Sequence, residues 1–113
     1  MRFVGWIVRR ARRMVARWRG DLLVILSEGD TLPALIPLRR MIHMVDKGDK
    51  WSVGFLCPCG CGETIELLLP AFIKPHWALT VDDIGRPTLT PSIWRKEGCR
   101  SHFFVKGGRI IWV

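Results

Sequence analysis

Hydrophobic and polar residues follow one period before residue 20 and another after residue 40. Over residues 1–20, at about 100° per residue, apolar side chains fall on one arc of a helix and arginines on the opposite arc. This pattern predicts an amphipathic helix that ends near Gly20 and Asp21. The apolar arc comprises Phe3, Val4, Ile7, Val8, Ala11, Met14, Val15 and Trp18, and the arginine arc comprises Arg2, Arg9, Arg12, Arg13, Arg17 and Arg19.

Beyond residue 40 the apolar positions alternate with a period of two, as in strands that bury one face. A turn at residues 46–50 predicts a hairpin, and Gly107-Gly108 predicts a second hairpin at the end of the chain. The predicted strands are residues 41–45, 51–57, 64–69, 77–81, 86–89, 103–105 and 109–112.

These elements predict a mostly β (α+β) fold in one small domain. Residues 1–20 are expected to form a basic helical arm, and residues 21–40, which contain Pro33 and Pro37, an extended linker. Residues 41–113 are then a small antiparallel sheet or hairpin domain. Within it, Cys57-Pro58-Cys59-Gly60-Cys61-Gly62-Glu63 has the composition of a zinc knuckle.

The positive charge is concentrated in the predicted arm. Of 18 Lys and Arg residues in the chain, seven arginines lie in residues 1–20, which contain no acid. The remaining 11 face all 10 acidic residues, so the body carries only about +1 of the net +8. Binding of nucleic acid or of an anionic membrane is therefore expected, if at all, through residues 1–20. A helix that packs on the domain with a solvated arginine face is the simpler alternative.

The four cysteines are the strongest chemical signal in the chain. No segment reaches the roughly 20 apolar residues of a membrane span, so we expect a cytoplasmic protein. In a reducing compartment clustered cysteines indicate a metal site before a disulfide. Cys57, Cys59 and Cys61 are interleaved with glycines that allow tight turns, and Cys99 precedes His102 by the spacing of paired zinc ligands.

Together these residues predict one zinc ion per chain. Three thiolates and one imidazole favour Zn²⁺ over Mg²⁺ or Ca²⁺. Cys57, Cys61, Cys99 and His102 make a Cys₃His set, with Cys59 as an alternative ligand. His43 lies within a predicted strand and is expected to be a strand residue and not a metal ligand.

Four segments resemble a known bacterial family. They are residues 51–63 with the sequence Cys-Pro-Cys-Gly-Cys-Gly, and residues 88–94, 98–104 and 108–112. Over residues 35–113 the chain resembles the domain of unknown function 6527 family, whose genes accompany bacterial ubiquitin-like proteins and their E1-like and E2-like conjugation enzymes. The resemblance implies a zinc-dependent peptidase with those proteins as partners. It carries the metal ligands over to Cys57, Cys61, Cys99 and His102.

A catalytic zinc ion needs an exchangeable position for water. In a zinc mechanism three of the four candidates hold the metal, and Glu63 takes the proton of the bound water and passes it to the leaving amine. Ser92 or Ser101 would then steady the oxyanion. A solvated Glu63 on a strand is the alternative interpretation.

Two functions follow from these observations. The first is a zinc metallopeptidase, a hydrolase that processes or deconjugates a bacterial ubiquitin-like protein. The second is a non-catalytic structural zinc-binding module that mediates protein or nucleic-acid interaction, in which metal replaces a missing core. The number of protein ligands on the metal distinguishes them.

Overall fold

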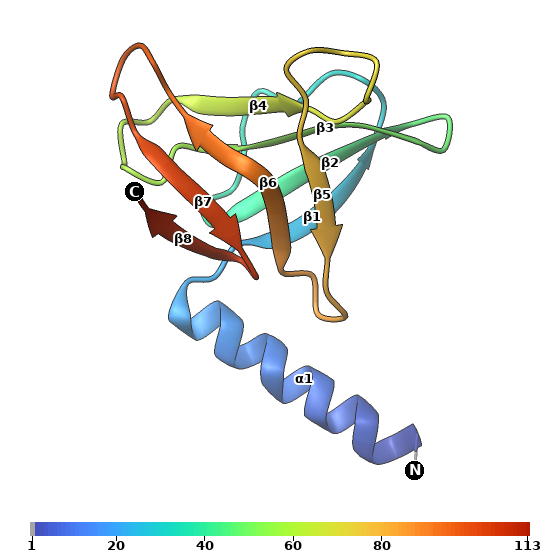
Figure 1. Cartoon of the computed structure of the whole chain (residues 1–113). Helices are drawn as coiled ribbons and strands as arrows, with labels where there is room; N and C mark the ends of the chain where they lie inside the picture. Colours follow the sequence, from blue (N-terminus) through green and yellow to red (C-terminus); the bar gives the residue numbers. More distant parts are fainter. Residues whose placement is uncertain (1) are drawn as a thin grey trace.

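The computed structural model contains two four-stranded sheets and one helix (Figure 1). It describes residues 2–113. The first sheet has the order β1-β2-β3-β4 and the second β5-β6-β7-β8. The mostly β fold predicted from the alternating pattern is confirmed. The elements are α1 (Arg2–Arg19), β1 (Leu23–Glu28), β2 (Arg40–Asp46), β3 (Asp49–Leu56), β4 (Thr64–Leu68), β5 (Ala78–Val81), β6 (Pro87–Trp94), β7 (His102–Lys106) and β8 (Arg109–Trp112).

The main core lies between the two sheets. Phe55 from β3 and Phe103 from β7 are fully buried and meet edge to face, with ring centroids 6.3 Å apart. Around them the inward positions of both sheets form one apolar cluster, as expected when alternate residues of each strand share a face. The cluster comprises Leu22, Met41, Val53, Phe55, Cys57, Ile65, Leu67, Leu79, Leu89, Ile93, Phe103 and Val105.

The segment expected to be a linker is largely built into the fold. Residues 23–28 form β1, which pairs in parallel with β2, so the first sheet is not wholly antiparallel. The start of β1 and the residue before it also connect the sheets, because Leu22 N–H donates to the Gly108 carbonyl and Val24 N–H to that of Gly85. A parallel pair needs a long connection, and residues 29–39 provide it.

That connection covers the outer face of the first sheet. Ile36 packs there with Ile42 and Met44 of β2, and Leu32 is partly buried against the same cluster. A Cβ atom on Gly54 would lie 2.4 Å from a methyl carbon of Leu32, so Leu32 would have to move to admit a larger residue. His43 lies in β2 as predicted and is buried.

The helix ends as the sequence predicts. Gly20 takes a positive φ of 79°, and Asp21 N–H donates to the Ala16 carbonyl at 2.9 Å, the pattern of a Schellman cap. Ala16 is buried against Leu23 and Ile84. An ion pair of 3.0 Å joins Arg12 to Asp83 in the turn between β5 and β6. The C-terminal part of α1 thus fixes the helix to the sandwich.

Candidate functional site

Three of the cysteines lie in the loop between β3 and β4. Gly60 and Gly62 have φ values of 87° and 84°, which favour glycine. The Cys57 amide donates to the Glu63 carbonyl at 2.8 Å, and the Gly60 amide donates to the Cys57 carbonyl at 3.2 Å. These bonds close the loop on itself, so three thiol side chains converge within five residues.

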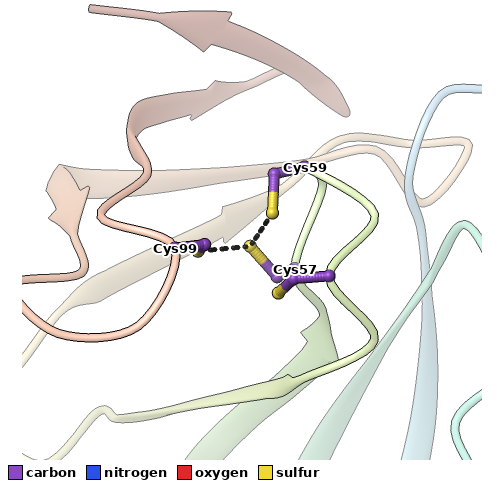
Figure 2. Close-up of side chains that lie close together, drawn as sticks. Cys57, Cys59 and Cys99 are labelled. Carbon is purple, nitrogen blue, oxygen red and sulfur yellow. Dashed lines mark hydrogen bonds between the residues drawn. The ribbon is translucent and has the colours of Figure 1, made fainter.

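Cys99, from the loop between β6 and β7, completes a cluster of four thiols. Figure 2 shows three of them, Cys57, Cys59 and Cys99, with their sulfurs pointing toward one another. All four Sγ atoms lie within 4.8 Å of one another. Cys57 Sγ is 3.4 Å from Cys59 Sγ and 3.6 Å from Cys99 Sγ. The thiols are free, and these separations far exceed the roughly 2.04 Å of a disulfide. A tetrahedral zinc site with Zn–S bonds of about 2.3 Å requires sulfurs about 3.8 Å apart, so the cluster has suitable dimensions.

A hydroxyl group lies against the sulfurs. Ser101 Oγ is 3.2 Å from Cys99 Sγ and 3.8 Å from Cys57 Sγ, and Ser101 is buried. Its hydroxyl, followed by its backbone amide, lowers the pKa of the Cys99 thiol to about 6. The same hydroxyl is the largest influence lowering the pKa of Cys59. Both effects favour the thiolate, the form of cysteine that binds metal.

The Cys61 thiol behaves differently. The Glu63 amide lowers its pKa, but loss of hydration and the neighbouring thiols of Cys59, Cys57 and Cys99 together raise it to about 11. Four thiols this close resist carrying four negative charges at once. A cation within the cluster would relieve that repulsion.

Glu63 forms an ion pair with Arg95, which follows β6. The Glu63 carboxylate is the main influence raising the pKa of the Arg95 guanidinium, and Cys57 also contributes. Glu63 joins the cysteine loop to the end of β6, and half of its side chain remains exposed.

The structure brings three of the four predicted metal ligands together and adds Cys59 as the fourth sulfur. The His102 ring is directed elsewhere, with Nε2 at 3.0 Å from Ser92 Oγ. His102 begins β7 next to Ser101, and successive residues in extended backbone point to opposite sides. Because Ser101 points to the cysteines, His102 points away from them. The regular C-x-C-x-C spacing was the sequence signal for Cys59.

Ser92 and His102 form a second candidate site, on the outer face of the second sheet. Between the pairs Leu89–Val105 and Ile93–Phe103 the register shifts, so residues 90–92 stand opposite Phe104 alone. Such irregularities redirect side chains and are common beside active sites. Here the shift accompanies a hydrogen bond between the Ser92 hydroxyl and the His102 ring.

An aromatic side chain fixes the orientation of this histidine. Trp94 is paired with His102 across the two strands, and the rings stack with centroids 5.2 Å apart and planes 15° apart. The spacing of Ser92 and His102 in the sequence does not reveal the pair, because the two residues meet only through the pairing of β6 with β7. Sequence reasoning selected both residues but assigned them to other roles.

A comparison with family models identifies the family to which the chain belongs. The model of the bacterial ubiquitination-like system serine protease (BubE) family matches residues 28–113, and the chain belongs to this family. Membership of this family supports a peptidase in a bacterial ubiquitin-like system. It does not support the predicted family name, domain of unknown function 6527, or a metallopeptidase. Searches of curated proteins and of solved structures each returned no match.

Proposed function

We propose that this member of the bacterial ubiquitination-like system serine protease family cuts the tail of a ubiquitin-like protein, with Ser92 as nucleophile and His102 as base. The observation that carries the proposal is the 3.0 Å contact between Ser92 Oγ and His102 Nε2. A serine hydroxyl attacks a peptide carbonyl only when a neighbouring base takes its proton. His102 is within the required reach.

The reaction has two stages. Ser92 Oγ attacks the carbonyl carbon of the tail residue while His102 Nε2 accepts the hydroxyl proton. His102 then gives that proton to the departing amine, which leaves an ester between Ser92 and the ubiquitin-like protein. Water, deprotonated by His102, attacks the ester, and the proton returns to Ser92. The products are a free carboxyl and a free amine.

Trp94 would act on His102 as a positioning residue. In residues 2–113 no carboxylate hydrogen-bonds to the His102 ring. The acidic residue that orients the histidine in a Ser-His-Asp triad therefore has no counterpart among these residues. The Trp94 ring lies almost parallel to the imidazole and limits its rotation. A serine–histidine pair held by stacking is the arrangement that this geometry favours.

The cysteine cluster is the proposed zinc site, and its role is structural. Cys57, Cys59, Cys61 and Cys99 would hold the ion, and four protein ligands leave no position for a reactive water. The ion supplies a crosslink between the loops that follow β3 and β6. His102 lies three residues beyond Cys99, so this crosslink steadies the strand that carries the base.

The edge of β6 beside Ser92 is open and would receive the substrate tail. β5 pairs with β6 only as far as Thr90, so no strand among residues 2–113 covers the rest of β6 on that side. The Trp77 indole donates to the Ser92 carbonyl there, at 3.3 Å. The Arg95 amide bonds to Ser101 on the β7 side, so by alternation the Trp94 backbone faces the open edge. An extended tail would pair with this edge.

The test is cleavage of a precursor of the cognate ubiquitin-like protein, extended beyond its tail glycine and analysed by mass spectrometry. We expect Ser92→Ala to lower the cleavage rate by about 10³-fold or more, because the nucleophile is lost. His102→Ala should lower it by about 10²- to 10⁴-fold. Melting temperature and zinc content should stay near those of the wild type.

Ser27→Ala is the matched control, since Ser27 is a half-buried strand serine outside the pair. It should cut as the wild type does. Full activity in Ser92→Ala, with loss of activity in Glu63→Gln at unchanged zinc content, would instead support a zinc-bound water as the attacking group.

A further inference from the structure

The helix α1 exposes its apolar side chains instead of burying them. Trp18 is 87% exposed and Met14 65%. Ala16 alone is buried among the side chains described for this helix. The exposed apolar residues are Trp6, Ile7, Val8, Met14, Val15 and Trp18. All of these except Trp6 lie on one arc of the helix at about 100° per residue. Exposed apolar side chains gathered on one face of an element mark an interaction surface.

The apolar arc points away from the side by which the helix is attached. Ala16 and Arg12 hold α1 to the sandwich. Trp18 lies two residues from Ala16 and is therefore about 160° around the helix from it. Figure 1 shows α1 projecting from the sheets, with its N-terminal half beyond them. The attachment thus leaves most of the arc free to meet another surface.

Arginines border this arc and determine what can cover it. Residues 1–20 carry seven arginines and no acid. At about 100° per residue, Arg10 flanks one side of the arc and Arg19 the other. Arg9, Arg10 and Arg13 are exposed. Long arginine side chains at such borders keep their charge in the headgroup layer while the apolar residues enter the acyl layer.

We propose that α1 lies in the plane of an anionic lipid bilayer, with its apolar arc inserted and its arginines on lipid phosphates. In residues 2–113 no helix is long and apolar enough to cross a membrane, so α1 would rest on the surface. Nucleic acid would engage the arginines but leave the apolar arc in water. A second copy would bring two arginine-rich helices together at a cost in repulsion.

The proposed surface is independent of the proposed peptidase site. The family model begins at residue 28, beyond the helix, and Ser92 lies on the outer face of β6. The helix would therefore hold the enzyme at a membrane without taking part in cleavage.

The experiment is co-sedimentation of the full chain with vesicles of phosphatidylcholine, alone or mixed with phosphatidylglycerol. We expect binding to the anionic vesicles only. Combining Ile7→Ser, Met14→Ser and Trp18→Ser should weaken it by about 100-fold or more, because apolar burial is lost. Combining Arg9→Gln, Arg10→Gln and Arg13→Gln should weaken it on the order of 100-fold.

The matched control combines Leu35→Ser, Leu38→Ser and Phe72→Ser, which remove exposed apolar side chains outside the helix. It should bind as the wild type does, and all variants should keep their zinc and melting temperature. Equal binding to neutral vesicles, or wild-type binding by the apolar variant, would overturn the proposal. So would binding to double-stranded DNA that is tighter than binding to the anionic vesicles and unchanged in the apolar variant, or self-association without lipid that the apolar variant abolishes.

Discussion

At the scale of single residues, Cys59 and His102 decide which side chains could hold a metal ion. The sequence favoured a Cys₃His set because Cys99 and His102 have the spacing of paired ligands. The structure places the Cys59 sulfur 3.4 Å from that of Cys57 and the His102 ring against Ser92. Spacing alone does not reveal this, because the direction of a side chain depends on where its strand begins.

The two residues should therefore differ in their effect on zinc. We expect His102→Ala to retain about one zinc per chain, whereas Cys59→Ser should lower zinc affinity by more than about 100-fold and reduce the melting temperature. Chelator competition and thermal unfolding measure these effects. Zinc lost from His102→Ala and retained by Cys59→Ser would restore the histidine as fourth ligand.

At the scale of elements, the alternating pattern predicted both hairpins, β2–β3 and β7–β8, at close to their observed bounds. It missed β1, half of whose six residues are exposed and whose burial does not alternate. Its parallel partner lies across a connection of 11 residues, 29–39, so no local turn signal announces the pairing. The register shift in β6 was equally invisible, because it arises from pairing with β7.

The stacking between β6 and β7 predicts a positioning effect of Trp94. The side chain is 58% exposed, so Trp94→Ala should change stability little. Losing the ring stack should lower kcat for precursor cleavage by about tenfold, with KM nearly unchanged. Trp94→Phe should recover most of the loss, and Phe72→Ala, at another exposed aromatic, should have no effect. An equal loss in Trp94→Phe and Trp94→Ala would argue against stacking.

At the scale of the whole molecule, the sandwich brings two loops together at one end. The loop after β3 supplies three cysteines and the loop after β6 supplies Cys99, and Ser101 and His102 follow directly. Within this short segment, Ser101 thus faces the sulfur cluster and His102 faces the Ser92 hydroxyl. The helix α1 lies outside these two loops. This agrees with the charge distribution, since residues 1–20 are strongly basic and residues 21–113 are nearly neutral.

The central claim is that Ser92 is the nucleophile, and covalent labelling tests it most directly. A fluorophosphonate probe reacts with an activated serine, forming a P–O bond and releasing fluoride. After incubation of the zinc-loaded chain, peptide mass spectrometry should find one probe per chain, on Ser92. His102→Ala should slow labelling by about 10²- to 10⁴-fold, because the base is lost. Cleavage of the precursor by a wild-type chain that carries no probe on Ser92 would contradict the account.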